Sequence, residues 1–382
     1  MKSIKIILIS PYHGGSPQAW AEGFRQHSQH QITLLSLSGR FWKWRLHGGA
    51  VTLARRFMTN MACPDLFLAT DMLDVTTFLA LTRARCRQIP LLLYMHENQL
   101  TYPLPTDGRT GPMRRQLGER DQHYAFINFV SMLAADGVLF NSDFHRESFF
   151  ASLPRFLKHF PEYNELGAVS AIQAKSQTLP VGIDFNRLEP AGPQASPPLV
   201  LWNQRWEYDK NPETFFQALA QIADEGVPFR LALCGQQFGK RPAAFDAALS
   251  QFSDQLIHVG HAKPNRYRQL LWDAAVTIST AHHEFFGISI LEAIYAHTFP
   301  ILPHRLSYPE LLPKEAHDRC LYKNEAQLVD HLRWALTHPQ TARKTAVTLA
   351  HHIKKFNWTK MALEYDQIMA KTAVSRSAAT LT

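Results

Sequence analysis

Short apolar runs that suit β-strands alternate with helix-forming segments along the chain, and this series occurs twice. In the first series, the runs that we interpret as strands cover residues 4–10, 32–37, 66–70, 91–97, 137–142 and 177–181. In the second series they cover residues 199–203, 229–235, 256–260, 276–280 and 299–303. Alternation of this kind predicts parallel sheets with helices on both faces. We therefore expect an α/β chain with two doubly wound domains in tandem.

A proline-rich segment separates the two series. Residues 184–198, DFNRLEPAGPQASPP, hold four prolines and one glycine, and proline disfavours both helices and sheet interiors. A chain of 382 residues also exceeds the size of about 250–300 residues at which single cores stop growing. The predicted organisation is a first domain over residues 1–184, a linker over 185–198, a second domain over 199–355, a C-terminal helix over 356–372 that crosses back to the first domain, and a disordered tail over 373–382.

The second domain begins with a strand and a helix whose ends are marked in the sequence. Asn211 is the expected N-cap, Pro212 occupies the first helical position, and Gly226 follows the helix. Ligands of open α/β sheets bind at the carboxyl ends of the strands. We therefore expect the site in a cleft where the two sheets face each other.

Positive charge is concentrated near the N-terminus. The chain has 40 Lys and Arg against 32 Asp and Glu, a net charge of +8, and among residues 1–62 the only acid is Glu22. The string RFWKWRLHGGAVTLARR, residues 40–56, combines five cations with three aromatic side chains. Cations attract phosphates, and aromatic faces stack unpaired bases. The alternative is an amphipathic surface helix whose tryptophans anchor it in the core.

A second basic stretch, residues 107–120, contains Gly108, Gly111 and Pro112 and is predicted to be a loop.

Two carboxylates follow the predicted strand over residues 276–280. In HHEFFGISILEAIYA, seven residues separate Glu284 from Glu292, and Gly287 lies between them. If Phe286 or Gly287 opens a helix, the amides of Gly287, Ile288 and Ser289 form its N-terminus and favour a phosphate there. The two acids can accept hydrogen bonds from sugar hydroxyls. The alternative is a capping carboxylate followed by a surface glutamate.

Two cations follow the first strand of the same domain. Arg205 and Lys210 lie in NQRWEYDKNPE, directly before a helix. Arginine and lysine at this edge of a sheet are suited to a diphosphate. The alternative is a solvent-exposed salt bridge with Glu207 or Asp209.

The first domain places polar residues at corresponding positions. Its first strand ends in SPYHGGS, where Gly14 and Gly15 allow close approach of a ligand to the backbone. Because this is not G-x-G-x-x-G, it gives little support to a dinucleotide cofactor. His96, Glu97 and Asn98 follow another strand and are expected at the same edge.

Several kinds of protein are disfavoured by the composition. The apolar run over residues 4–9 is much shorter than the ~20 residues of a membrane span. The four cysteines, Cys63, Cys86, Cys234 and Cys320, are scattered without zinc-ligand spacing. We expect a cytoplasmic, reduced protein with no bound metal.

The E-x7-E string, the Arg205 and Lys210 pair and the Gly14-Gly15 loop resemble retaining nucleotide-sugar glycosyltransferases of the GT-B fold. Longer strings extend the resemblance: PYHGGS, GRFWKWRLHG, HENQLTYPLP, LWNQRWEYDKNPE, TAHHEFFGIS and LSYPEL. Together they are similar to the tRNA-queuosine α-mannosyltransferase family. This resemblance implies two Rossmann-like domains facing across a cleft, with the acceptor in the first and the donor in the second. It also implies transfer of mannose from GDP-mannose to the queuosine nucleoside of tRNA-Asp, with no metal and no cofactor beyond the sugar nucleotide.

The resemblance also implies roles for single residues. Glu292 holds the ribose and Glu284 the sugar hydroxyls, while Arg205 and Lys210 stabilise the departing diphosphate. His96 lies near the anomeric carbon. The remaining predicted donor contacts are Gly14, Gly15, Phe286, Gly287, Ile288 and Ser289, and the predicted acceptor contacts are Arg40, Lys43, Trp44, Arg45, His96, Glu97 and Asn98. The implied catalytic set is therefore Glu284, His96, Arg205 and Lys210.

Two other functions remain open at this stage. One is a glycosyltransferase of the same fold that uses another sugar nucleotide and a lipid or small-molecule acceptor, for which residues 40–56 could form an interfacial helix. The other is a non-catalytic RNA-binding protein. Retention of Glu284, Glu292, Arg205 and Lys210 argues against the second, and we expect no stable membrane association.

Overall fold

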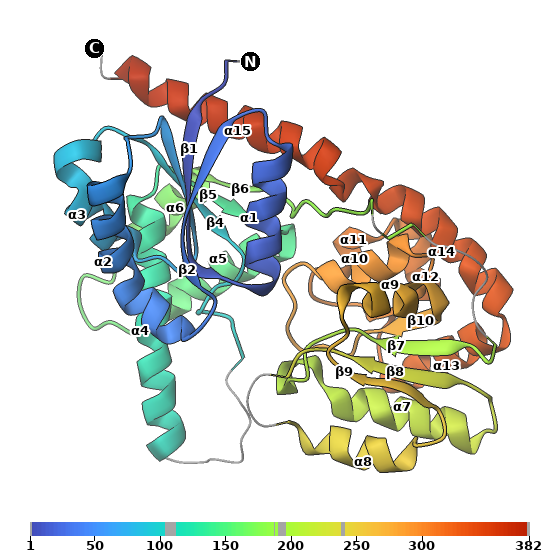
Figure 1. The fold of residues 1–382 in the computed structure, drawn as a ribbon. Helices are drawn as coiled ribbons and strands as arrows, with labels where there is room; N and C mark the ends of the chain where they lie inside the picture. Colours follow the sequence, from blue (N-terminus) through green and yellow to red (C-terminus); the bar gives the residue numbers. More distant parts are fainter. Residues whose placement is uncertain (1, 104–111, 187, 190–195, 238–240, 380–382) are drawn as a thin grey trace. The chain divides into compact units, whose positions relative to one another are not determined.

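The fold of this computed structural model contains two parallel sheets (Figure 1). Each sheet has six strands within the residues that the structure describes, which are 2–103, 112–186, 188–189, 196–237 and 241–379. One unit consists of Met1–Ile183 and Trp358–Thr382, and the other of Asp184–Asn357. Each sheet belongs to one unit and is described with it. The predicted α/β class with two doubly wound sheets is therefore confirmed, whereas the expected cleft between the sheets stays a prediction.

The first unit has the strand order β2-β1-β3-β4-β5-β6. Its strands are β1 (Lys5–His13), β2 (Gln31–Ser38), β3 (Leu66–Thr70), β4 (Leu91–Met95), β5 (Gly137–Phe140) and β6 (Ser176–Thr178). Its helices before the C-terminal one are α1 (Gly15–His27), α2 (Trp42–Asn60), α3 (Val75–Cys86), α4 (Pro112–Ala134), α5 (Asp143–Leu157) and α6 (Gly167–Ala174). Every residue of β3, β4 and β5 is buried, because helices cover both faces of a parallel sheet. This explains why these strands are continuous apolar runs in the sequence.

The second unit has the strand order β12-β11-β10-β7-β8-β9. Its strands are β7 (Leu199–Trp202), β8 (Arg230–Cys234), β9 (Leu256–Gly260), β10 (Ala274–Ile278), β11 (Phe299–Pro303) and β12 (Leu321–Tyr322). Its α-helices are α7 (Pro212–Asp224), α8 (Ala243–Gln251), α9 (Pro264–Asp273), α10 (Ile288–Tyr295), α11 (Tyr308–Leu311), α12 (His317–Cys320), α13 (Glu325–Thr337) and α14 (Pro339–Ile353). Short 3-10 turns are η1 (Tyr208–Lys210), η2 (Lys314–Ala316) and η3 (Lys354–Phe356). Strand β12 was not predicted from the sequence, since two residues are too few to show a period.

The start of α7 follows the prediction in position but not in detail. Asn211 precedes the helix and Pro212 is its first residue. However, Asn211 adopts a left-handed conformation with φ of 51°, and its side-chain amide donates to the hydroxyl of Thr214 at 3.0 Å. No side-chain cap bond forms at this residue. Asn211 therefore supports the chain reversal between η1 and α7 through its backbone.

Helix α15 (Trp358–Ala379) packs on the first unit. Trp358 is 1% exposed, and a Cβ atom built at Gly23 of α1 would lie 2.1 Å from its indole nitrogen. Glycine at this position thus allows the close approach of α1 and α15. Further along, Tyr365 accepts a hydrogen bond from the indole of Trp20 at 2.9 Å. The tail predicted to be disordered from residue 373 is helical as far as Ala379, and residues 380–382 lie outside the described part.

The segment predicted to be a linker over residues 185–198 is packed at its start. Phe185 is fully buried and stacks on Tyr295 of α10, with ring centroids 4.4 Å apart. The carbonyl of Leu188 accepts a hydrogen bond from the indole of Trp272 at 3.2 Å. The structure therefore assigns the beginning of this segment to the second unit, because its apolar side chains are buried there.

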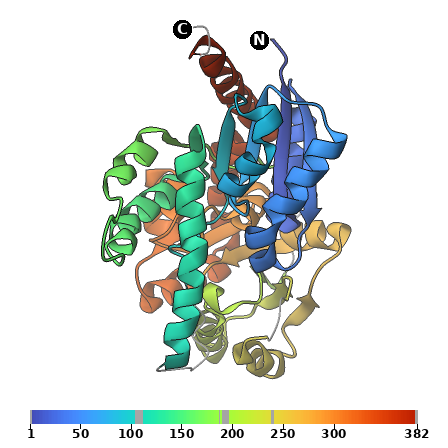
Figure 2. The same cartoon turned by 90° about the vertical axis from the view of Figure 1, so that its left-hand side faces the viewer.

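The predicted loop over residues 107–120 is wrong from Pro112 onwards. Helix α4 starts at this proline and continues to Ala134, and Figure 2 shows it along its length. Proline is favoured at the first helical position, where a missing N–H costs no hydrogen bond. The proline that we interpreted as a helix breaker is a helix start; residues 107–111 lie outside the described part.

Candidate functional site

The loops after β7 and β10 carry the charged residues singled out in the second unit. Strand β7 is central, with β8 on one side and β10 on the other. The chain leaves β7 towards β8 and later returns to β10, so connections on the two sides diverge at this point. Such a point, at the carboxyl ends of the strands, is where open α/β sheets bind ligands.

Lys210 lies at the centre of the charged group. Its ammonium nitrogen is 3.1 Å from a carboxylate oxygen of Asp209 and 3.3 Å from one of Glu284. It also donates to the carbonyl of His283 at 2.8 Å. Burial by itself would lower the pKa of Lys210, but Glu284 and Asp209 raise it above the ordinary lysine value. The 5%-exposed side chain is therefore a cation held between two acids.

Glu284 is ionised by the same contact. Burial would raise the pKa of this carboxyl group, but Lys210, together with smaller contributions that include His283 and the amide of Phe286, lowers it below its ordinary value. The side chain remains 24% exposed. A partly accessible carboxylate can accept hydrogen bonds from a hydroxyl-rich ligand.

Arg205 lies at the more exposed side of this group. Its guanidinium is 3.4 Å from Glu207, and its charge contributes to lowering the pKa of Glu284. The solvent-exposed salt bridge that we considered as an alternative to a ligand site is thus present between Arg205 and Glu207, whereas the salt bridge of Lys210 to Asp209 is buried. They coexist with the link from Lys210 to Glu284, so the two interpretations do not exclude each other.

Gly287 directs the start of α10. It has a φ of 95°, and a Cβ atom there would lie 3.3 Å from the ring of Tyr308. Ile288 and Ser289 begin the helix, as predicted, and amides of a first turn have no partner within the helix. The amide of Phe286 instead approaches Glu284 at 3.4 Å. The turn before α10 thus brings a backbone amide to the carboxylate that also contacts Lys210.

Glu292 lies one turn into α10 and has a neutral partner. Its carboxylate accepts a hydrogen bond of 2.7 Å from the hydroxyl of Tyr267 on α9. Burial raises the pKa of Glu292, and the bond from Tyr267 opposes this shift. Glu292 and Glu284 therefore have different electrostatic surroundings, since only Glu284 is paired with a lysine.

Several residues that shape this region were not predicted from the sequence. Asn203 donates to the carbonyl of Ser289 at 2.7 Å, and Gln204 donates to the carbonyl of Ile278 at 3.0 Å. These side chains fix the ends of β7 and β10 relative to α10. Both follow directly after a predicted strand, which is the signal that could have identified them, whereas nothing in the sequence pairs Tyr267 with Glu292.

The glycines after β1 have a structural role in the first unit. A Cβ atom at Gly14 would lie 3.1 Å from the Cα atom of Gly39, so the two backbone segments are in close contact. Gly15, the first residue of α1, has a φ of 55° and open space around its Cα atom. The site prediction for Gly14 and Gly15 stays a prediction, but the sequence requirement for glycine is explained.

The three polar residues after β4 are largely engaged within the first unit. The backbone amide of His96 donates to Asp71 at 3.1 Å. Burial lowers the pKa of the His96 ring to about 3, and burial together with the charge of Glu97 raises the pKa of Asp71 to about 8. The buried Asn98 accepts hydrogen bonds from the amides of residues 100 and 101. His96 and Asp71 are therefore neutral at pH 7, and Asn98 stabilises the turn.

Helix α2 carries the predicted acceptor contacts at its start. Trp44 is 64% exposed and Phe41 is 76% exposed, so the alternative in which the tryptophans anchor the helix in the core is wrong for Trp44. Arg40 is also exposed. The ammonium group of Lys43 lies 5.2 Å from the ring of Trp42. A mixed aromatic and cationic surface is thus present.

Family comparisons agree with these two units. A family profile described as "tRNA-queuosine alpha-mannosyltransferase N-terminal" matches residues 5–183, and one described as "Glycosyl transferases group 1" matches residues 187–348. A protein of Drosophila melanogaster named tRNA-queuosine alpha-mannosyltransferase is 32% identical over 355 residues, which cover 89% of each chain. The chain belongs to the tRNA-queuosine alpha-mannosyltransferase family. It is therefore a glycosyltransferase, and the resemblance stated from its sequence strings is confirmed.

Solved structures extend the match to the fold. Sucrose-phosphate synthase from Thermosynechococcus elongatus superposes with a TM-score of 0.72 and 14% identity, covering 98% of this chain and 100% of the other. Anabaena HepE in complex with UDP gives 0.67 and 14%, covering 97% and 100%. The family member thus has the GT-B fold. Within the described ranges, no helix is both long and apolar enough to cross a membrane.

Proposed function

We propose that this glycosyltransferase moves mannose, with retention of configuration, from GDP-mannose to the queuosine nucleoside of tRNA-Asp. The proposal rests on membership of the family and on the charged group at the ends of β7 and β10. The main structural support for donor binding in the second unit is the position of the Lys210 ammonium, which lies 3.1 Å from Asp209 and 3.3 Å from Glu284.

Lys210 and Arg205 are proposed to stabilise the diphosphate as it leaves. The raised pKa of Lys210, caused by Glu284 and Asp209 against the effect of burial, supports a permanent positive charge at neutral pH. A fixed cation is most effective where negative charge develops in the transition state. The first-turn amides of α10 favour the same charge.

Glu284 and Glu292 are proposed to bind hydroxyl groups of the donor. Glu284 takes the transferred sugar, because it remains ionised and partly exposed beside Lys210. Glu292, held by Tyr267, takes the ribose. Carboxylates suit these tasks since they accept several hydrogen bonds.

The proposed reaction exchanges one bond at the anomeric carbon for another. The bond from this carbon to the diphosphate oxygen breaks with its electron pair on oxygen, which gives an oxocarbenium-like transition state. A queuosine hydroxyl oxygen then bonds to the same face, and its proton passes to the departing phosphate oxygen. His96, neutral at pH 7 because its pKa is about 3, is proposed to orient sugar groups without adding charge.

The first unit is proposed to bind the tRNA. Its support is the excess of cations over residues 1–62, with Glu22 as the only acid, and the exposed aromatic side chains at Phe41 and Trp44. Anticodon loops offer phosphates and unstacked bases. We further propose a cytoplasmic reaction without metal or additional cofactor and without stable membrane association.

The test is transfer to defined substrates. Purified protein is incubated with queuosine-containing tRNA-Asp and a panel of sugar nucleotides, and the digested nucleosides are weighed. The expected result is a gain of one hexose on queuosine with GDP-mannose, retained when a chelator is present. Glu284→Gln is expected to lose the product while binding tRNA normally. Transfer from another donor, or none to queuosine, would contradict the proposal.

A further inference from the structure

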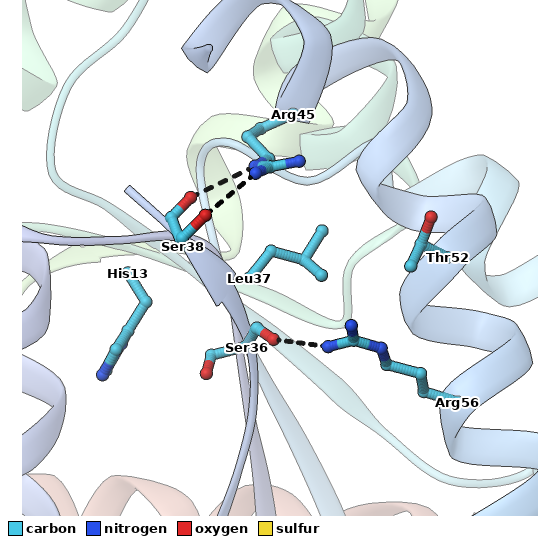
Figure 3. Close-up of a pocket in the computed structure, with 7 residues that line it drawn as sticks. All are labelled: His13, Ser36, Leu37, Ser38, Arg45, Thr52 and Arg56. Carbon is cyan, nitrogen blue, oxygen red and sulfur yellow. Dashed lines mark hydrogen bonds between the residues drawn. The ribbon is translucent and has the colours of Figure 1, made fainter. Parts of the chain in front are cut away.

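The first unit has a pocket of its own, whereas the charged group at the ends of β7 and β10 belongs to the second unit. It has a volume of about 530 Å³ and lies where the end of β2 faces α2 (Figure 3). Its lining residues are His13, Ser36, Leu37, Ser38, Arg45, Thr52 and Arg56. Only Arg45 among them belongs to the acceptor contacts predicted from the sequence.

Two arginines reach into this pocket from one helix face. Arg45, Thr52 and Arg56 of α2 are spaced by seven and four residues, which places them on one side of a helix. Gly49 lies between them on that side, and a Cβ atom there would already lie 3.4 Å from Pro11. The helix can therefore approach the sheet closely while its arginines extend over β2.

Strand β2 holds both guanidinium groups in place. Arg56 donates to the carbonyl of Ser36 at 3.1 Å. Arg45 donates to the carbonyl and the hydroxyl of Ser38, both at 3.2 Å, and Figure 3 shows Leu37 between the two arginines. Arginine has further N–H donors beyond those used here. The pocket thus presents oriented donors, with the hydroxyls of its serines and threonine nearby.

No carboxylate lines this pocket, and neither arginine forms an ion pair within the described residues. The acids that flank β2 and α2 in the sequence are engaged elsewhere: Glu22 faces His13 at 3.6 Å and pairs with Arg25, and Asp65 accepts a hydrogen bond from the amide of Lys5 at 2.7 Å. Uncompensated arginines favour an anion. A sugar would require acceptor groups such as Glu284 and Glu292 provide in the second unit, and this pocket has no acidic acceptor.

We propose that the pocket binds a backbone phosphodiester of the acceptor RNA through Arg56 and Arg45. This inference deepens the proposed function, because it assigns a phosphate position on the tRNA-binding unit. The nearby start of α2 exposes Phe41 and Trp44, which can stack the bases next to that phosphate. A planar guanidinium matches two phosphate oxygens, which a lysine cannot do.

The experiment compares Arg56→Gln with Arg55→Gln. Both side chains are exposed on α2 and each change removes one positive charge, but Arg55 does not line the pocket. The probe is an RNA hairpin with the tRNA-Asp anticodon loop, and its affinity is measured at several salt concentrations. We expect Arg56→Gln to weaken binding about tenfold, as for loss of a charge-assisted hydrogen bond, and Arg55→Gln to weaken it less than about twofold.

Salt dependence and a conservative variant separate phosphate binding from a change in folding. The slope of log affinity against log salt should fall by about 0.7–1 for Arg56→Gln, with unchanged thermal stability. Arg56→Lys should restore the slope but not the affinity, since the charge returns without the guanidinium fork. If Arg55→Gln and Arg56→Gln weaken RNA binding equally, the proposal that the pocket binds a phosphate is wrong.

Two further measurements distinguish other occupants and the proposed function itself. If Arg56→Gln weakens binding of GDP-mannose instead of RNA, the pocket belongs to the donor. If it reduces sedimentation with vesicles of phosphatidylcholine and phosphatidylglycerol while RNA binding is unchanged, its ligand is a lipid headgroup. Loss of RNA binding in a protein that transfers no mannose would leave the pocket valid and contradict the proposed function alone.

Discussion

Two pairs of buried ionisable groups, one pair in each unit, follow the ends of strands and differ in their charge. In the second unit, Lys210 and Glu284 pair with each other, so the pKa of the lysine is raised and that of the acid is lowered. In the first unit, Asp71 and His96 are buried without an opposite charge, so burial raises the pKa of Asp71 to about 8 and lowers that of His96 to about 3. The Lys210 and Glu284 pair therefore keeps its charges, whereas Asp71 and His96 are neutral at pH 7.

This difference shows that the fold alone does not determine the chemistry at the edge of a sheet. Burial penalises any charge, and an opposite charge within a few ångströms offsets that penalty. In the proposed reaction, the leaving diphosphate needs a permanent cation, and the charge of Lys210 suits this role. In the proposed reaction the acceptor group is a neutral hydroxyl, and the uncharged His96 and Asp71 add no negative charge near the end of β4 that would repel the phosphates of an RNA.

The largest effect is expected from breaking the charged group. Lys210→Ala should lower kcat by about 10²–10³-fold, as for loss of a group that stabilises transition-state charge. It also leaves Asp209 and Glu284 without their cation, so unfolding should become easier by about 3–5 kcal/mol. Rapid-quench transfer assays and urea unfolding measure the two effects.

The control for this variant is Lys210→Arg, which keeps the charge and should recover stability better than activity. The affinity for tRNA should not change in either variant, because the proposed RNA contacts lie in the other unit. A folded Lys210→Ala protein with normal kcat would remove Lys210 from the catalytic residues.

Much of this electrostatic pattern could not be read from the sequence. The strands were predictable because continuous apolar runs such as β3 and β4 are buried on both faces. Glu284 and Lys210 were found from their position after strands, but their 3.3 Å contact joins loops that are 74 residues apart. Asp71 was missed because its signal is burial, which a single acid at a strand end does not reveal.

Asp71→Asn should remove a pH dependence of the first unit. The folded chain keeps the proton of Asp71 up to about pH 8, whereas the unfolded chain loses it near the ordinary aspartate pKa of 3.8. Between these values the folded state binds more protons, so rising pH lowers stability by about 1.4 kcal/mol per pH unit. Asparagine does not titrate, so the stability of the variant relative to wild type should increase with pH. Hydrogen exchange of the β3 and β4 amides measures this locally.

The His96 ring changes the stability of the first unit with pH in the opposite direction. Its folded pKa of about 3 is below the ordinary value of 6.5, so its contribution is lost as pH falls through that range. Because both proteins retain His96, this contribution cancels in the comparison. Parallel pH profiles for Asp71→Asn and wild type would mean that Asp71 is ionised in the folded chain.

A smaller effect is expected from Tyr267→Phe, which tests the neutral partner of Glu292. The change removes the 2.7 Å hydrogen bond to the carboxylate, and the pKa of Glu292, already raised by burial, should rise further. Donor KM should increase by up to about tenfold, more at acidic than at alkaline pH, with little change in kcat. Nucleotide titration calorimetry across pH checks this, and a pH-independent loss would point to packing alone.

The smallest effect is expected from Glu97→Gln, which separates the contribution of a neighbouring charge to the pKa of Asp71 from that of burial. The charge of Glu97 is the second cause of the raised pKa of Asp71. Glu97→Gln should therefore lower that pKa, so that the loss of stability with rising pH ends at a lower pH. Above about pH 8 the first unit should then be more stable by up to ~1 kcal/mol. Glu147→Gln on α5 removes an exposed acid and controls for net charge. If Glu97→Gln leaves the profile unchanged but weakens tRNA binding, Glu97 acts on the acceptor and burial alone neutralises Asp71.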